Sequence, residues 1–520
     1  MRALLLRLTV SAIVLSGVPS ADAQVPHRRD VLAPTAPGAA TPEADHGHDK
    51  APPDMDAAAK PHPFDRNLFL PGPVYPEGSY DVDAQIAIYG GKRAVETPRP
   101  VLELGYRQYS EGPLGAGVDL VGRRNLVRPQ LLAFGDLRSA VAYNDQGARE
   151  AGQIATRLNL DIDLRLTATE RLHAFFRPLD NGRRFTRAEF AGGDSGGGEL
   201  LLDGKPETFF FEGDLGAIQA GLTDRNAPYD LPFTFGLVPL FFQNGIWVDD
   251  AFVGGAVSIP ARNSRLLDVS NFDITFFAGF DEVESTALRK ADGLVDDRSA
   301  DIYGAVLFAD TRGGHLEAGY GYLNDTRDRG GLSYHSAAVG WTRRYGSILS
   351  NSVRLVGSFG QEPDNRSRQT ADGYALLIEN SLITSLPSTL VPYANVFIGH
   401  DRPQPLARGN EGLLKNTGIS FETDGLTGFP LLNDTAQDAW GGALGVSYLF
   451  DLSRQVVVEL ATVQPFGGSS DAIRGDETAV SARYQQKLTQ AVLVRFDAIV
   501  GFRDNADNVS GVRVELRRKF

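Results

Sequence analysis

Charged and polar residues alternate with apolar ones in the stretch between residues 154 and 166. The polar positions are Arg157, Asn159, Asp161, Asp163 and Arg165. Because successive side chains of a β-strand leave opposite faces, this spacing predicts a strand with one charged face and one apolar face. Such a face carries no catalytic chemistry by itself. Opposed acids and bases along a water-filled passage instead act on solutes through charge and size.

The same alternation recurs after a polar break at 167–170 and again near the end of the chain. The polar face that it predicts comprises Arg157, Asn159, Asp161, Asp163, Arg165, Arg171, His173, Arg177, Glu459, Arg495, Asp497, Arg513, Glu515 and Arg517. We expect these residues to line a pore. Two interpretations stay open at this point. The acids and bases either select solutes, or neutralise one another as salt bridges along a wet interior.

Two other clusters have residue types that could do chemistry. A glycine-rich run at 192–198 contains Ser195, but we interpret it as an exposed loop tip, and no hydrolase or phosphate-binding motif accompanies it. His46 and His48 lie near Asp45, Asp49 and His62, a set that could hold a transition metal. A solvated polar tail is the favoured interpretation there, so we expect no metal, no cofactor and no enzyme activity, while metal binding by His46 and His48 stays open.

Composition narrows the class of protein. The chain has no cysteine, which argues against disulfides, thiolate metal sites, cysteine catalysis and a lipoprotein anchor. A net charge of −14 argues against nucleic acid as a partner. No stretch approaches the ~20 apolar residues that a transmembrane helix needs. The chain must therefore reach stability through an extensive fold of another kind.

The N-terminal part divides into two segments before the fold begins. Residues 1–23 are typical of a secretory signal peptide, with Arg2, a largely apolar run from Ala3 to Val18 that Arg7 interrupts, and the cleavage motif Ala21-Asp22-Ala23. Residues 24–75 are rich in Pro, Ala, Asp and His and cannot bury enough apolar surface to offset the entropy of ordering, which predicts a disordered periplasmic leader. The folded domain is expected over residues 76–520.

From there the pattern is strand after strand, with connections that alternate in length. Short connections are expected at Thr167–Glu170, Asp310–Gly314, Arg344–Ser347, Asp451–Arg454 and Lys487–Gln490, and long ones at Asn181–Pro206, Thr223–Gly245, Asp281–Arg298, His400–Asp438 and Gln464–Gly475. Short turns on one side and long loops on the other are typical of an outer-membrane barrel. We predict an all-β fold, a transmembrane antiparallel up-and-down β-barrel of about 18 strands (16–20). Ala217–Leu222 is counted as one of these strands, and an additional pair near 81–89 and 101–109 would give about twenty.

One predicted outside loop is unusually apolar. The segment from Leu231 to Phe242 contains Phe233, Phe235, Leu240, Phe241 and Phe242. Because so many large apolar side chains must be sheltered from water, we predict that it folds into the barrel mouth as a constriction loop.

The last ten residues, from Gly511 to Phe520, resemble the terminal strand of bacterial outer-membrane β-barrels. That family ends on an aromatic residue preceded by apolar residues at alternate positions, as Val512, Val514 and Leu516 are here. Arg518 departs from the pattern, which favours an apolar or aromatic residue. The resemblance implies that Phe520 is an assembly signal for the barrel-assembly machinery. Over residues 80–520 the layout is similar to large single-chain porins, including alginate-export and substrate-specific channels.

The expected function is therefore a porin of the Gram-negative outer membrane that passes small hydrophilic solutes through a charged lumen. Its partners would be outer-membrane lipid, lipopolysaccharide, the barrel-assembly machinery and the solutes; association of copies into a homo-oligomer is left open. A second hypothesis is a barrel that serves as a sleeve or exporter for a partner, either a secreted polysaccharide or a periplasmic electron-transfer protein. An outer-membrane enzyme is a third and weaker hypothesis.

Overall fold

A computed structural model describes residues 98–106 and 115–520, apart from 182–183, 193–196, 291–292, 294, 328, 366–367, 387–388, 410–411, 423–425, 452 and 471. The predicted signal peptide, the predicted leader with His46, His48 and His62, and the first predicted additional strand at 81–89 lie outside the described residues. No helix among the described residues has both the length and the apolar character to cross a bilayer.

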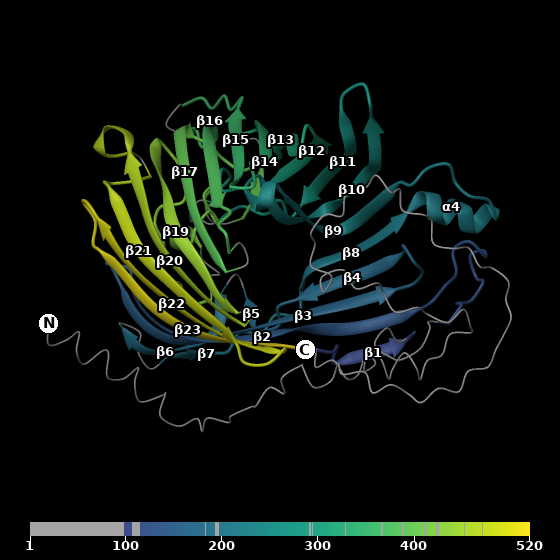
Figure 1. The fold of residues 1–520 in the computed structure, drawn as a ribbon, viewed down its shortest axis with the longest axis horizontal. Coiled ribbons are helices and arrows are strands. Elements are labelled where there is room, and N and C mark those ends of the chain that lie inside the picture. The colour runs from purple at the N-terminus through teal and green to yellow at the C-terminus, as the bar shows by residue number, and fades with distance from the viewer. Residues whose placement is uncertain are drawn as a thin grey trace, which may run out of the picture. The chain divides into compact units, whose positions relative to one another are not determined.

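The described residues form a closed antiparallel β-barrel of 18 strands, as the alternation predicts. In ring order the strands are β2 (Gln130–Asp145), β3 (Glu150–Arg165), β4 (Arg171–Phe176), β8 (Pro206–Asp214), β9 (Pro232–Phe242), β10 (Val248–Ser264), β11 (Val269–Asp281), β12 (Ala300–Thr311), β13 (Gly314–Asp325), β14 (Tyr334–Tyr345), β15 (Leu349–Phe359), β16 (Asp372–Leu382), β17 (Leu390–Arg402), β19 (Ala439–Asp451), β20 (Arg454–Pro465), β21 (Glu477–Lys487), β22 (Val492–Arg503) and β23 (Val509–Lys519). The ring closes between β2 and β23, where Val141 pairs with Val514. Figure 1 shows β2 to β4 on the opposite side of the barrel from β14 to β17.

Shorter elements decorate the ring. They are β1 (Leu102–Gly105), β5 (Asp180–Asn181), β6 (Arg184–Gly192), β7 (Gly198–Glu199), β18 (Ala407–Arg408), the helix α4 (Leu215–Thr223) and the 3₁₀ turns η1 (Gln243–Gly245), η3 (Ile419–Phe421) and η4 (Phe466–Gly468). β1 is what the structure describes of the second additional strand predicted near 101–109. It pairs with the start of β2, where Leu102 faces Ala133, and adds no strand to the ring.

The connections separate by length onto the two ends of the barrel, as predicted. The short-turn end carries the connections at 166–170, 265–268, 312–313, 346–348, 383–389, 452–453 and 488–491, and the long-loop end carries those at 177–205, 282–299, 326–333, 360–371, 403–438 and 466–476. Four connections depart from the simple rule. Those at 146–149, 243–247 and 504–508 are short and lie at the long-loop end, and the α4 connection at 215–231 is long and lies at the short-turn end.

Two sequence-based predictions in this region are wrong, and they cancel in the strand count. Ala217–Leu222, predicted as a strand, lies inside α4, whose first turn is capped by Asp214 accepting a hydrogen bond from the Ala217 N–H at 2.7 Å. Six alternating residues are too few to separate a strand from a helix, and the capping aspartate decides. The predicted loop Thr223–Gly245 contains β9, a wall strand that pairs with both β8 and β10.

The constriction-loop prediction therefore fails for Leu231–Phe242. Along β9 the side chains alternate, so Phe233, Phe235 and Phe241 lie on the outer face while Leu240 and Phe242 lie on the inner one; Phe235 and Phe241 are 55% and 59% exposed. Phe235 packs against Phe211 of β8 with ring centroids 5.4 Å apart. The large apolar side chains need shelter, as expected, but three of the five find it on the outside of the wall. Pro232 and Pro239 did not prevent the strand.

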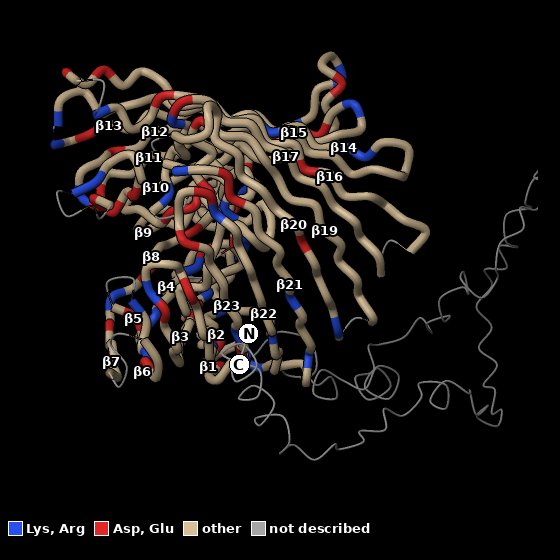
Figure 2. The backbone as a smooth tube through the Cα atoms, turned by 90° about the vertical axis from the view of Figure 1, so that its left-hand side faces the viewer, with Lys and Arg blue, Asp and Glu red and all other residues tan. Residues whose placement is uncertain are grey.

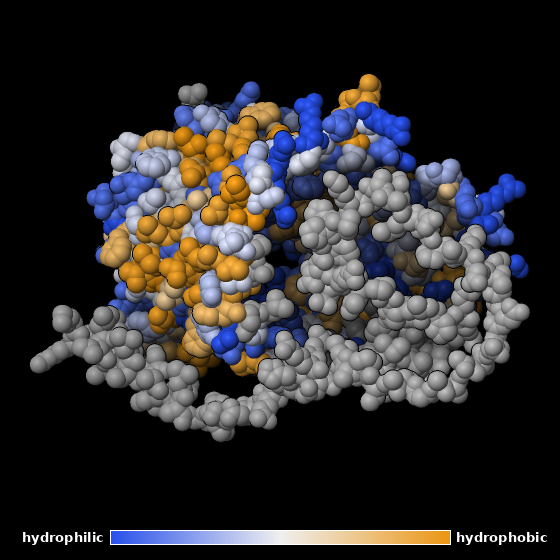
Figure 3. All heavy atoms as spheres, viewed as in Figure 1, coloured by the Kyte–Doolittle hydropathy of each residue, from blue (hydrophilic) through white to orange (hydrophobic). Residues whose placement is uncertain are grey.

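An apolar belt covers the outer face of the barrel. Its members include Leu444, Val458, Leu460, Val480, Val500, Val512, Val514 and Leu516, all between 43% and 62% exposed. Figure 3 shows apolar side chains gathered over the strands that Figure 1 labels β19 to β21. Residues between these on the same strands, such as Arg513 and Glu515, are almost fully buried. The apolar face of the wall thus points outward and the charged face points inward. This is the reverse of a soluble β-sandwich, whose apolar faces point inward.

Candidate functional site: a charged lumen narrowed by inward loops

One heavily charged part of the inner wall lies on β21, β22 and β23. The carboxylate of Asp497, with a side chain 0% exposed, accepts hydrogen bonds from Arg483 Nε, Arg495 Nε and Arg513 Nη2, each at 2.7 Å. The strand register aligns Asp497 with Arg483 on one side and Arg513 on the other. Three guanidinium groups on one carboxylate leave an excess of positive charge at this point of the wall.

Ion pairs continue across the seam where the ring closes. Arg138 of β2 binds Glu515 of β23 through Nε at 3.0 Å and Nη2 at 2.8 Å. Arg517 Nε lies 2.7 Å from Asp136, which also accepts a hydrogen bond from Asn159 at 3.1 Å. Lumenal charge pairs thus accompany the backbone pairing of the first and last strands.

A second charged group lies on β3, β4 and β8, toward the short-turn end. His173 stands between two carboxylates, with Nδ1 3.7 Å from Asp163 and Nε2 3.2 Å from Glu212. Its ring stacks on Phe210 at 4.8 Å. Arg171 lies 3.7 Å from Glu212. Charged positions recur along β3 and β4 in Figure 2.

The remaining residues of the predicted polar face fall on the same side of the wall. Arg157 binds Asp180 of β5 at 3.2 Å and covers the Phe185 ring at 4.1 Å. Arg165 pairs in register with Arg171, and Asp161 with Phe175. Arg177, just past β4, binds Glu207 at 3.2 Å. The structure thus brings these residues together on the inner face, in two groups joined through the seam. The predicted Glu459 lies apart from both groups, buried under the connection at 403–438.

The other side of the lumen is filled by connections that fold inward from the long-loop end. Trp247 and Val248 follow η1, Val283 and Leu288 come from the connection at 282–299, and a larger set comes from the connection at 403–438. That larger set comprises Leu406, Ala407, Leu413, Leu414, Phe421, Phe429, Leu432 and Ala436. With inner residues of the wall strands they form one buried apolar cluster, which we call the apolar plug.

Trp247 is a member of the apolar plug and is 0% exposed. Its indole N–H donates to Ser336 Oγ at 2.9 Å, so the one polar atom of the ring is satisfied. The ring lies against Gly319 of β13, where a Cβ would overlap it. The backbone N–H of Leu406 donates to the Trp247 carbonyl at 2.9 Å, which ties two of the inward connections together.

A wall carboxylate holds the 403–438 connection in place. Glu459 of β20, 1% exposed, accepts from the N–H of Ile419 at 3.0 Å and of Ser420 at 2.8 Å, both in η3, and from the Tyr393 hydroxyl at 2.6 Å. Just after η3, Glu422 lies against Arg483 Nη1 at 2.7 Å and Arg495 Nη2 at 3.1 Å. Burial acts to raise the pKa of Glu422, but the charges of Arg483 and Arg495 outweigh it and hold the pKa below its usual range.

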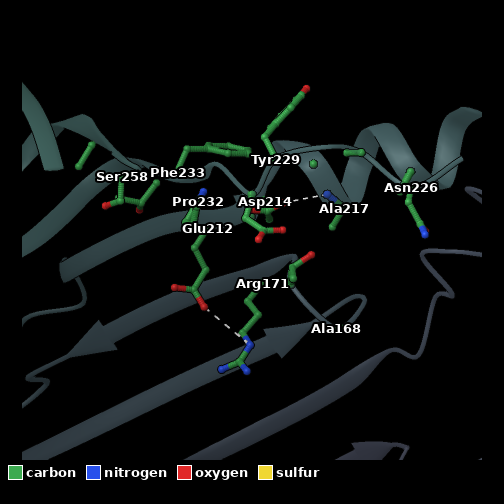
Figure 4. A pocket seen from close by; sticks show the side chains of 18 residues that line it. Ala168, Arg171, Glu212, Asp214, Ala217, Asn226, Tyr229, Pro232, Phe233 and Ser258 are labelled. Carbon is green, nitrogen blue, oxygen red and sulfur yellow. Dashed lines mark hydrogen bonds and ion pairs between the residues drawn. The ribbon is translucent and has the colours of Figure 1, made fainter. Parts of the chain in front are cut away.

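A cavity of about 710 Å³ with a mixed polar and apolar lining opens at the short-turn end, beside α4. Figure 4 shows Arg171 and Glu212 joined by an ion pair on one side of it, and Asp214 capping α4 on the other. Nearby, the turn at 166–170 is fastened by Glu170. Burial favours a raised pKa for Glu170, but hydrogen bonds from Thr167, Asn125 and Thr169 hold the pKa below its usual range. The cavity thus lies next to the second charged group and shares Arg171 and Glu212 with it.

Sequence reasoning missed several charged residues of the lumen. Arg483 and Arg138 lie on predicted strands. Because side chains alternate between the two faces of a strand, every second residue from a known inward position also points inward, and this rule would have found both arginines. Glu422 and Asp180 lie in long connections, where no period reports which way a side chain points.

No protein-family model and no curated protein matches the chain. Among solved structures, it is similar to the outer-membrane protein OpdK of Pseudomonas aeruginosa with vanillate (13% identity, 75% of this chain and 98% of that chain, TM-score 0.49). It is also similar to OccAB4 of Acinetobacter baumannii (11% identity, 75% and 97%, TM-score 0.48) and to OccK11 (OpdR) of Pseudomonas aeruginosa (11% identity, 75% and 96%, TM-score 0.47). The barrel architecture itself rests on the strand pairing described above.

Proposed function

We propose that this chain is an outer-membrane channel that conducts small hydrophilic solutes through its charged lumen. The observation that carries the proposal is that the closed barrel has an apolar belt on its outer face and paired charges on its inner face. A closed ring leaves no unpaired strand edge in the hydrocarbon layer, and a charged inner face keeps water inside the passage. The long-loop end faces the outside of the cell and the short-turn end faces the periplasm.

The apolar plug supports a channel over a sleeve for another protein. It occupies part of the lumen with the chain's own connections, which leaves less room for a partner polypeptide. A polysaccharide exporter would need a wide continuous passage, which the same plug reduces. The mutual pairing of lumenal charges favours neither strict cation nor strict anion passage, and the excess of arginine around Asp497 favours anions locally.

Planar-bilayer recording on refolded protein tests the proposal. Stepwise conductance increases in potassium chloride, together with swelling of liposomes in small sugars and exclusion of larger ones, are the expected result. Insertion without conductance steps would count against a channel and favour a sleeve filled by a partner.

Assembly is a separate part of the proposal. Phe520 closes the ring through backbone hydrogen bonds with Gly135, at 3.0 Å from its N–H and 2.9 Å to its carbonyl. We propose that it also serves as the assembly signal. Deleting Phe520 should lower the amount of heat-modifiable, membrane-inserted protein, while Phe520→Tyr, which keeps the aromatic terminus and both backbone bonds, should retain it. Equal levels of the deletion variant and the unchanged protein would refute this role.

A further inference from the structure

Arg483 and Arg495 project two guanidinium forks side by side from the inner wall. Each fork uses its Nε edge on the buried carboxylate of Asp497, at 2.7 Å. Each then has an outer Nη group on the carboxylate of Glu422, at 2.7 Å from Arg483 and 3.1 Å from Arg495. Asp497 therefore fixes the orientation of both forks, and their outer nitrogens converge on one point.

Glu422, which accepts from the outer nitrogens of both arginines, differs from Asp497 in burial and in the part of the chain that it comes from. Asp497 is 0% exposed and belongs to the wall, whereas the Glu422 side chain is 27% exposed and comes from the 403–438 connection. Both ion pairs of Glu422 run to these two wall arginines. The third arginine, Arg513, binds Asp497 and lies under the Phe429 ring at 5.0 Å. The Arg483 and Arg495 forks thus present donors toward this partly exposed position.

Charge arithmetic shows what Glu422 changes. The directly paired groups are three arginines and two carboxylates, which sum to +1. Glu459 lies nearby, but it accepts from Tyr393 and from two backbone N–H groups. Without the Glu422 charge the same groups sum to +2, with two convergent donors left for another anion. Convergent guanidinium groups bind small oxyanions strongly, because each bond is charge-assisted.

We propose that Arg483 and Arg495 form an anion-binding site in the lumen and that Glu422 is its tethered, competing anion. The inference rests on the proposed channel function and deepens it by naming the residue that sets charge selectivity. With Glu422 in place the site is self-occupied, so a passing anion must displace a carboxylate that is attached to the protein. The wild-type channel consequently discriminates only weakly in favour of anions.

The test compares Glu422→Gln with wild-type protein in planar bilayers under a potassium chloride gradient. The reversal potential of Glu422→Gln should shift toward chloride, with the chloride-to-potassium permeability ratio rising by about twofold or more, since one negative charge leaves the lumen beside the two arginines. Acetate, added at constant ionic strength, should reduce the chloride current more in Glu422→Gln than in wild type. Glu422→Ala should shift in the same direction and replaces the Gln variant if that one does not assemble.

Glu379→Gln is the matched control. It removes one lumenal carboxylate that binds Arg354 on β15, away from the Asp497 group, so it changes net charge equally without freeing the two forks. It should shift the reversal potential less and leave the acetate effect unchanged. Equal shifts in the two variants, or an unchanged potential in Glu422→Gln, would overturn the anion site. Absence of conductance in wild type would instead overturn the proposed function.

Discussion

The two sides of the lumen are built on different physical principles. The side formed by β20 to β23 and β2 to β4 is held by charged side chains that the wall strands project inward, such as Asp497 and Arg138. The side formed by β10 to β17 is covered by the apolar plug, in which Trp247 is fully buried, and the edge of the plug also reaches Val463 of β20 and Ile499 of β22. Ion pairs between wall side chains thus dominate the first side, whereas the second side is a hydrophobic core enclosed by the barrel.

The difference separates stability from selectivity. Burial of apolar surface contributes about 25 cal/mol per Å², so the plug stabilises the inward connections without any charge. Paired charges along the wall contribute less to stability, because the Coulomb gain is offset by desolvation. They nevertheless determine the field that a solute meets. Glu459 and Glu422 connect the two sides, because both are acids that join the 403–438 connection to wall residues.

The largest expected effect is on the plug side. Trp247→Ala should lower the free energy of unfolding by about 3–5 kcal/mol, because it leaves a large cavity and removes a hydrogen bond to Ser336. Urea unfolding followed by loss of heat-modifiable migration measures it. Leu266→Ala, in a turn where the side chain is 93% exposed, is the control and should cost little. A loss below about 1 kcal/mol for Trp247→Ala would show that the plug is not a packed core.

The outer belt should respond next most strongly. Leu460→Arg places a charge on the lipid-facing side of β20 and should cost about 2–4 kcal/mol if the position lies near the bilayer midplane. Gln455→Arg is the matched control, because Gln455 lies on the inner face of the same strand and binds Ser447 at 2.7 Å. Both are measured by unfolding of protein refolded into vesicles. Equal costs for the two variants would mean that the two faces are wrongly assigned.

A smaller effect is expected where the two sides meet. Glu459→Gln weakens the acceptor of the Ile419 and Ser420 N–H groups and should cost about 1–3 kcal/mol, the value of hydrogen bonds to a charged group. Faster hydrogen exchange of these two amides measures it. Glu477→Gln, whose carboxylate accepts one backbone bond from Asn433 at 2.7 Å, should cost less. Unchanged exchange at Ile419 and Ser420 would show that the apolar contacts alone hold η3.

The two sides also differ in how far the sequence predicts them. Strand alternation places Asp497 and Arg513 on an inner face, because a period of two reports which way each side chain points. The plug has no such period. Leu414, Phe421 and Leu432 lie in an irregular connection, and only the completed barrel shows that they fold inward. The Leu231–Phe242 prediction failed for a related reason: its apolar content was recognised, but two prolines obscured the alternation that makes it a wall strand.

Acidification should have the smallest effect on the reversal potential, and the effect of protonating Glu422 should appear only at low pH. The pKa of Glu422 is held below its ordinary value of 4.5 by Arg483 and Arg495, so its carboxylate stays ionised from neutral pH down through 4.5. For a carboxyl group whose folded pKa is lowered, the stabilising contribution is present above the unfolded pKa and is lost as pH falls through the folded one. The difference in reversal potential between wild type and Glu422→Gln should therefore hold from neutral pH down to 4.5 and should narrow only at lower pH. Glu422→Gln already lacks the titrating charge and should show a smaller shift in that acid range. A full-size acid shift in Glu422→Gln would assign the titration to another carboxylate and would place charge control in the wall alone.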